Sequence, residues 1–123
     1  MPSFEKSPPE FVTYFQDIIR DFPQVEVRMM FGYPCAFVNT HMATGLFADK
    51  LFVHLSPTDE KEFMAIPGAA SFAPMQNRPM KGYVLFPGDM LATRLLVKKW
   101  ITRSLVYLVS LPAKPKTISK KRM

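Results

Sequence analysis

Hydrophobic residues recur at helical spacing over the first part of the chain. They follow Ser7-Pro8-Pro9-Glu10, in which serine and glutamate have the spacing of a capping box and proline suits a first helical turn. Pro23 ends the pattern, because proline breaks a helix. The segment is therefore predicted to be a helix, and its buried stripe consists of Phe11, Tyr14, Phe15, Ile18, Ile19 and Phe22.

After Pro23 the period changes to two. Apolar residues at 25, 27 and 29 alternate with Glu26 and Arg28, which is typical of an extended chain. Beyond Pro34 we expect a hairpin with Asn39-Thr40 as its two-residue turn. This turn places Phe37 opposite Met42 and Cys35 opposite Thr44.

A second hairpin is expected with Asp49-Lys50 as its turn, which places Leu46 opposite Val53 and Thr44 opposite Leu55. Both pairings agree on one apolar face of a three-strand meander, and helices are expected to cover that face. Its residues are Cys35, Phe37, Met42, Leu46, Leu51, Val53 and Leu55.

The rest of the chain predicts two helices and two strands. Ser56-Pro57-Thr58-Asp59 starts a short helix that ends at Pro67-Gly68, and 69–73 and 83–86 are predicted strands. The last helix runs from Asp89 to Ser110. The fold class is thus α+β, an antiparallel sheet of about five strands in the order α-β-β-β-α-β-β-α, with helices packed on it. Residues 1–112 are expected to form a single domain, and 113–123 a basic disordered tail.

Composition agrees with one small domain. Of the 123 residues, 48% are hydrophobic, and no segment approaches the roughly 20 uninterrupted apolar residues of a membrane helix. The N-terminus lacks a signal pattern, and the single cysteine suits a reducing compartment. We expect a cytoplasmic protein that contacts no membrane.

The positive charge is concentrated in the C-terminal third. Residues 1–89 contain seven Lys/Arg and ten Asp/Glu, a net charge of −3, whereas 90–123 contain nine Lys/Arg and no acid, a net charge of +9. Such clustering can attract nucleic acid, although a solvated helix face and tail would have the same composition. The candidate nucleic-acid or anion contacts are Arg94, Lys98, Lys99, Arg103, Lys114, Lys116, Lys120, Lys121 and Arg122.

The residues that could carry chemistry form no recognisable constellation. Cys35 is expected on the buried face, and His41 and His54 on the other face as surface or half-exposed residues. The acids within 59–62 occupy a first helical turn, where the helix dipole favours negative charge. No phosphate loop, nucleophile elbow or metal-ligand spacing occurs. We expect no enzyme activity, cofactor or metal.

A small enzyme of an unrecognised type is one alternative to a binding protein. The loop from Pro74 to Gly82 carries Arg78 and Lys81, which could hold an anion, but charged loop residues are normally solvated.

Two separated blocks of the sequence carry a family resemblance. The first comprises Arg28-Met29-Met30-Phe31-Gly32, Phe37-Val38 and the segment Gly45-Leu46-Phe47-Ala48-Asp49-Lys50-Leu51-Phe52-Val53, and the second is Pro79-Met80-Lys81-Gly82-Tyr83-Val84-Leu85-Phe86-Pro87. These blocks resemble the N-terminal domain of the TfoX (Sxy) family. The resemblance implies the same order of elements and a regulatory or binding role, without catalytic residues.

Full-length TfoX proteins are regulators of competence genes and carry a second, C-terminal domain. Because this sequence has no room for one, we expect a stand-alone version of the N-terminal domain. The family often has lysine in place of His54.

Two apolar surfaces could contact a partner. On the other face of the meander, Phe47 and Phe52 accompany Val38 and Ala43; either a helix covers this face, or the two phenylalanines are exposed and mark an interface. The last helix has a second apolar face, so it is either deeply buried or docked onto a second copy. The leading hypothesis is a non-catalytic binding or regulatory module that contacts a protein partner or a second copy in a homodimer. Its candidate interface consists of Leu91, Leu95, Leu105, Val109, Phe47 and Phe52.

Overall fold

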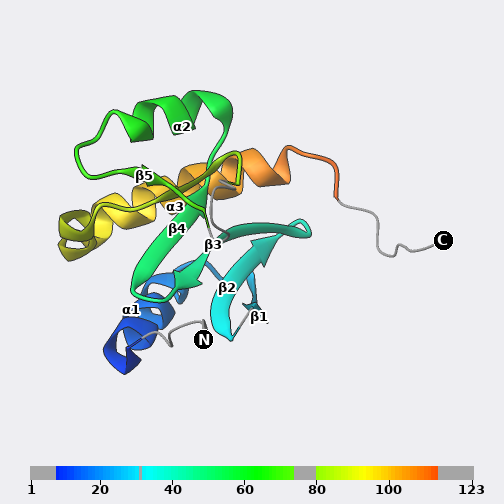
Figure 1. Ribbon diagram of the computed structural model, residues 1–123. Coiled ribbons are helices and arrows are strands. Elements are labelled where there is room, and N and C mark those ends of the chain that lie inside the picture. Colours follow the sequence, from blue (N-terminus) through cyan, green and yellow to red (C-terminus); the bar gives the residue numbers. More distant parts are fainter. Residues whose placement is uncertain (1–7, 31, 74–79, 114–123) are drawn as a thin grey trace.

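One antiparallel sheet organises the fold. The computed structural model describes residues 8–30, 32–73 and 80–113, and within these ranges six strands follow the spatial order β1-β2-β3-β4-β6-β5. This confirms the predicted α+β class, with the extended segment after Pro23 as an additional edge strand (Figure 1). The strands are β1 (Glu26–Met30), β2 (Tyr33–Val38), β3 (His41–Phe47), β4 (Lys50–His54), β5 (Ala70–Ser71) and β6 (Tyr83–Leu85).

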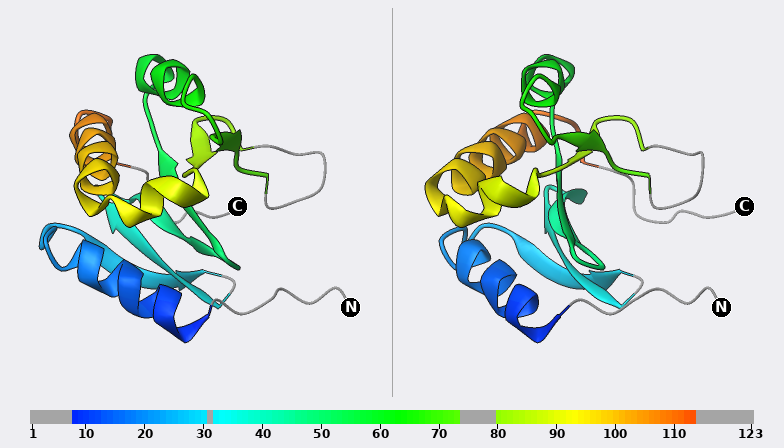
Figure 2. Two further views of the ribbon diagram at one scale, coloured as in Figure 1. Left: turned by 90° about the vertical axis from the view of Figure 1, so that its left-hand side faces the viewer. Right: turned by 60° about the vertical axis from the view of Figure 1, so that its left-hand side comes forward.

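Helices α1 (Pro9–Ile19) and α3 (Arg94–Val109) cover the same face of the sheet (Figure 2). Helix α2 (Pro57–Met64) packs beside α3, where Phe63 meets the Trp100 ring edge-on at 5.0 Å. The Ser56 hydroxyl accepts a hydrogen bond from the Asp59 N–H at 3.2 Å, which confirms the predicted cap of α2. For α1, Pro8 is the N-cap and makes no side-chain cap; Ser7 lies outside the described residues.

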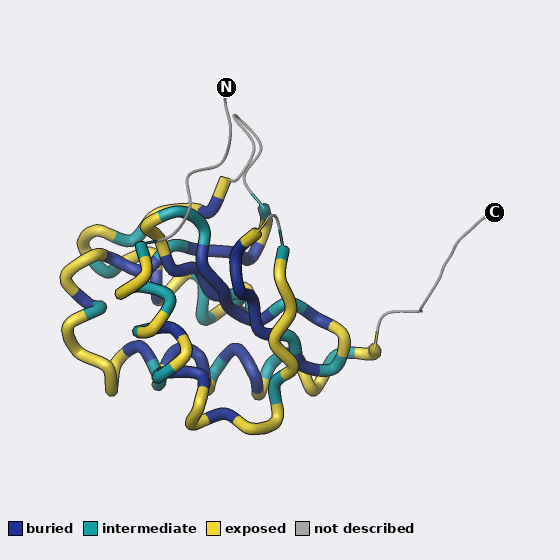
Figure 3. Tube along the Cα trace, turned by 90° about the horizontal axis from the view of Figure 1, so that it is seen from below, coloured by how far each residue is buried: buried dark blue, intermediate teal, exposed yellow. Residues whose placement is uncertain are grey.

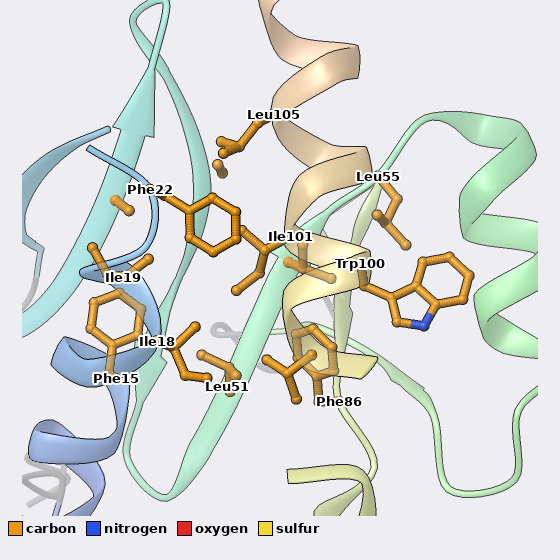
Figure 4. Packing of buried hydrophobic residues seen from close by; sticks show 14 of the residues in the cluster. Phe15, Ile18, Ile19, Phe22, Leu51, Leu55, Phe86, Trp100, Ile101 and Leu105 are labelled. Atoms are coloured by element: carbon orange, nitrogen blue, oxygen red, sulfur yellow. The ribbon is translucent and has the colours of Figure 1, made fainter. Parts of the chain in front are cut away.

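The larger core lies between the sheet and these helices. Figure 4 shows side chains of α1 and α3 meeting those of the strands, and Figure 3 shows buried stretches in the middle of the molecule. Burial of these apolar side chains supplies most of the driving force for folding. The helices contribute Phe15, Ile18, Ile19, Val97, Trp100, Ile101, Leu105 and Leu108, and the strands contribute Ala36, Val38, Ala43, Leu46, Leu51 and Val53.

A β-bulge alters the predicted pairing of β2 with β3. Phe37 lies opposite Met42, as predicted, but Cys35 lies opposite Gly45 and not opposite Thr44. The register shifts between Ala36 and Phe37, so that β3 contains one extra residue. The extra residue is Ala43, which has no partner in the β2 ladder.

The turn between β3 and β4 also differs from the prediction. Phe47 pairs with Lys50, so the turn residues are Ala48 and Asp49, and Ala48 has a left-handed φ of 55°. Leu46 therefore lies opposite Leu51, and the predicted pairings of Leu46 with Val53 and of Thr44 with Leu55 are wrong by two residues. A shift of two leaves every side chain on its face.

The bulge has the larger consequence, because it divides the predicted apolar face. Leu46, Leu51, Val53 and Leu55 belong to the helix-side core. Cys35 belongs to a smaller cluster on the opposite face of the sheet, and Phe37 and Met42 pack against that cluster. The prediction that Cys35 and Leu55 share one face is therefore wrong, because the two residues lie on opposite faces of the sheet.

The last helix is shorter than predicted. Residues Gly88–Ala92 form a 3₁₀ segment (η1), and Thr93 interrupts the helical backbone with φ −109° and ψ 85° before α3 begins at Arg94. Strand β5 comprises Ala70–Ser71 in place of the predicted 69–73. The proposed tail lies outside the described residues from 114 onward, as does 74–79 of the loop.

Two leucines of α3 provide a matched test of this packing. Replacing the buried Leu105 by alanine should lower the free energy of unfolding by about 2–5 kcal/mol, because it leaves a cavity between helix and sheet. Replacing the exposed Leu95 should change it by less than about 0.5 kcal/mol. Urea denaturation followed by circular dichroism measures both, and equal losses would contradict the described orientation of α3.

Candidate protein-binding surface

Ion pairs attach α3 to α1 on one flank. The Arg94 guanidinium lies 3.8 Å from the Asp17 carboxylate and 5.0 Å from the Tyr14 ring centroid. One turn further along, the Lys98 ammonium donates to the Asp21 carboxylate. This hydrogen bond is the main reason that the pKa of Asp21 is lowered. Two of the predicted nucleic-acid contacts, Arg94 and Lys98, are thus engaged within the domain.

Arg103 attaches α3 to α2 on the other flank. Its guanidinium lies 3.5 Å from the Asp59 carboxylate and 3.1 Å from the Glu62 carboxylate, and it covers the Trp100 ring at 4.8 Å. Asp59 and Glu62, which were expected to stabilise the start of a helix, therefore also pair with the Arg103 charge of α3. A third predicted nucleic-acid contact is engaged by this pair.

Lys99 differs from these three basic residues. It is exposed, and its ammonium lies 5.6 Å from the Trp100 ring centroid. Among the described residues, no carboxylate comes within ion-pair distance of it. The remaining predicted contacts, Lys114, Lys116, Lys120, Lys121 and Arg122, lie outside the described residues.

A line of exposed residues runs along α3 between the two flanks. From position 95 to position 109 they follow one another at spacings of four, three, four and three residues, which keeps them on one side of the helix. The three aliphatic members are 79% (Leu95), 64% (Val106) and 56% (Val109) exposed. We call this line the α3 stripe; it consists of Leu95, Lys99, Thr102, Val106 and Val109.

The α3 stripe includes only part of the interface that the sequence predicted. Leu95 and Val109 are exposed, whereas Leu105 is buried against the sheet. Leu91 lies in η1 and is half-buried, and its carbonyl accepts a 2.7 Å hydrogen bond from the Tyr14 hydroxyl. Val106 was missed, although its spacing of eleven residues from Leu95 and three from Val109 places it on their side of the helix.

The two phenylalanines of the predicted interface are covered to different extents. Phe52 is buried on the sheet face opposite the helices, stacked 4.4 Å from Phe72, while Phe47 is half-buried with its ring 5.5 Å from Phe72. Gly45 permits this packing: a Cβ atom there would lie 2.6 Å from Cys35 Sγ and 2.9 Å from Phe52 Cζ. Phe52 therefore belongs to the smaller core and not to an exposed surface.

The histidines and other residues that could carry chemistry lie apart from one another, and the two histidines pack against other parts of the domain. His41, which was expected near the surface, is buried, and its Nε2 lies 2.8 Å from the Pro112 carbonyl oxygen. The His54 ring stacks on Tyr83 at 4.1 Å. No group of three His, Cys, Asp or Glu side chains that could hold a metal occurs among the described residues. Lys81 is exposed, and Arg78 lies outside the described residues.

Two side chains of the smaller cluster have pKa values that burial raises. Burial raises the pKa of the Cys35 thiol to about 11 and that of the Tyr83 phenol to about 12. The Tyr83 hydroxyl donates to the Met42 carbonyl at 3.3 Å. A thiol with this pKa carries little thiolate at neutral pH and is a poor nucleophile.

Comparison with known proteins identifies one family. A family model described as the TfoX N-terminal domain matches residues 17–107 of the 123-residue chain. No curated protein and no solved structure matches. Along the described residues, no helix has both the length and the apolar composition needed to cross a membrane.

The raised pKa of Cys35 predicts a loss of stability in alkali. Between the unfolded pKa near 9 and the folded value of about 11, the unfolded chain releases a proton that the folded chain retains, so stability falls as pH rises. Urea titrations at a series of alkaline pH values should give a steeper fall for the wild type than for Cys35→Ala, by up to about one proton in the linkage slope. Parallel curves would show that the buried thiol does not contribute.

Proposed function

The chain belongs to the TfoX N-terminal domain family, and we propose that it is a non-catalytic binding module that contacts a protein partner through the α3 stripe. The observation that carries this proposal is the exposure of Leu95, Val106 and Val109 in one line on a helix whose charged flanks are already paired. Exposed apolar residues at helical spacing, bordered by polar residues, are typical of protein–protein contact surfaces.

The charge of the stripe favours a particular class of partner. Lys99 lies between Leu95 and Val106 in the stripe, and within the described part of the chain no carboxylate neutralises it. A matching partner presents an amphipathic helix with aliphatic residues at spacings of three and four and an Asp or Glu opposite Lys99. The aliphatic contacts would supply affinity, and the ion pair would set orientation.

Direct nucleic-acid binding is less well supported by α3. Phosphate contacts require cations that can exchange their counterions for phosphate, and Arg94, Lys98 and Arg103 already have carboxylate partners. An enzymatic role for Cys35 is disfavoured by its burial and raised pKa.

Three variants of exposed residues test the proposed function. Proteins crosslinked to the wild-type domain in an extract of its host should be identified by mass spectrometry, then purified and titrated calorimetrically. Val106→Asp and Lys99→Glu should each weaken binding of the identified partner by about tenfold or more. Val106→Asp would bury a charge in the interface, and Lys99→Glu would repel the acid of the partner. Met64→Asp on α2, also an exposed apolar residue, is the matched control and should bind normally.

Two results would refute the proposal. One is a partner whose affinity is unchanged by both Val106→Asp and Lys99→Glu. The other is tight, strongly salt-dependent binding of a short duplex oligonucleotide that Lys99→Glu abolishes, which would identify nucleic acid as the ligand of this helix.

A further inference from the structure

The two edges of the sheet differ in how they are protected. At one edge, β5 has only two residues, Ala70 and Ser71. At the other edge, β1 has five residues, and Val27 and Met29 are 52% and 63% exposed. Long exposed edge strands readily pair with another strand, and most proteins shorten or cover them. The edge formed by β1 is therefore a candidate contact surface separate from α3.

The pairing of β1 with β2 determines which backbone groups face outward. Met29 lies opposite Pro34, which has no N–H, so this is a non-hydrogen-bonded pair of the antiparallel ladder. Hydrogen-bonded and non-hydrogen-bonded pairs alternate, so Val27 belongs to the same class as Met29. The N–H and C=O groups of both residues consequently point away from β2, in the plane of the sheet.

The side chains of β1 differ between the two faces. Val27 and Met29 lie opposite Ala36 and Pro34, on the face that the helices cover. On the other face, Arg28 lies 3.1 Å from the Glu26 carboxylate and 5.3 Å from the Phe37 ring centroid. The strand thus carries one acid and one base, two residues apart on the same face.

This order of charges is self-complementary. We propose that two copies of the chain pair antiparallel through β1 around a two-fold axis at Val27. Glu26 then lies opposite Arg28 of the partner subunit, and Arg28 lies opposite Glu26 of the partner subunit. Opposite charges directly across an antiparallel pair stabilise it.

The backbone and the apolar side chains fit the same register. Each Val27 N–H donates to the carbonyl of Val27 of the partner subunit, and each Met29 N–H donates to the carbonyl of Val25 of the partner subunit. The Val25 N–H itself already donates to the Phe22 carbonyl at 3.1 Å and is not needed. The exposed Val27 side chains meet at the axis, and each Met29 side chain covers Val25 of the partner subunit.

A register displaced by two residues is excluded by charge. Displacement in one direction would place Arg28 opposite Arg28 of the partner subunit, and displacement in the other would place Glu26 opposite Glu26 of the partner subunit. Either pair would be non-hydrogen-bonded, so its side chains would be closest. Like charges directly opposite one another destabilise a sheet. The proposed dimer does not depend on the α3 stripe, which lies on a different part of the surface.

Two charge-reversed variants and their mixture test the pairing. Analytical ultracentrifugation should show a dimer of the wild type, and Glu26→Arg and Arg28→Glu should each raise its dissociation constant about tenfold or more, because both symmetry-related pairs become repulsive. An equimolar mixture of the two variants should restore the dimer, since the heterodimer regains both opposite-charge pairs. Circular dichroism should show that each variant keeps its fold.

Three results would overturn the proposal. The first is a wild type that remains a monomer at the highest soluble concentration. The second is a dimer that Glu26→Arg leaves intact, and the third is a mixture that stays monomeric. A dimer that Val106→Asp dissociates while Glu26→Arg does not would assign self-association to α3 and also exclude β1.

Discussion

The contact between α3 and the sheet at β3 determines which residues of the helix remain exposed. Val97, Ile101 and Leu108 are buried on this side. Between them Ser104 is fully buried, and its hydroxyl donates to the Ala43 carbonyl at 3.4 Å. A small side chain at 104 lets the helix approach the bulge residue closely. Once this side is fixed on the sheet, helical geometry directs Leu95, Val106 and Val109 to the outside.

The bulge also explains why the sheet has apolar residues on both faces. Without Ala43 as an extra residue, Cys35 and Leu55 would share a face, as the alternating pattern predicts. With it, the first part of β2 pairs so that Cys35 joins Phe52, Phe72 and Tyr83 opposite the helices. A small domain thus has two hydrophobic clusters, and the aromatic residues after Pro34 belong to both. Phe52 is buried because this cluster, and above all the stacked ring of Phe72, covers it.

Sequence patterns predicted the elements better than their register. The stripe in α1, the cap at Ser56 and the α+β order were all recognisable, because local spacing and capping chemistry act within a few residues. The bulge, the turn at Ala48-Asp49 and the break at Thr93 depend on contacts across the sheet or between helix and sheet. Of the helix residues in the predicted interface, Leu95 and Val109 are exposed and Leu105 is buried, whereas the exposed Val106 was not among them. The ion pairs that engage Arg94, Lys98 and Arg103 join residues more than 40 positions apart and have no local signal.

Helix α3 presents Leu95, Val106 and Val109 to solvent, while its opposite side packs against β3. Methyl NMR with a soluble gadolinium chelate measures this most directly, because the chelate broadens only methyl groups that solvent can reach. The described arrangement predicts strong broadening for Leu95, Val106 and Val109 and protection for Leu105 and Leu108. Equal broadening of Leu105 and Leu95 would contradict it.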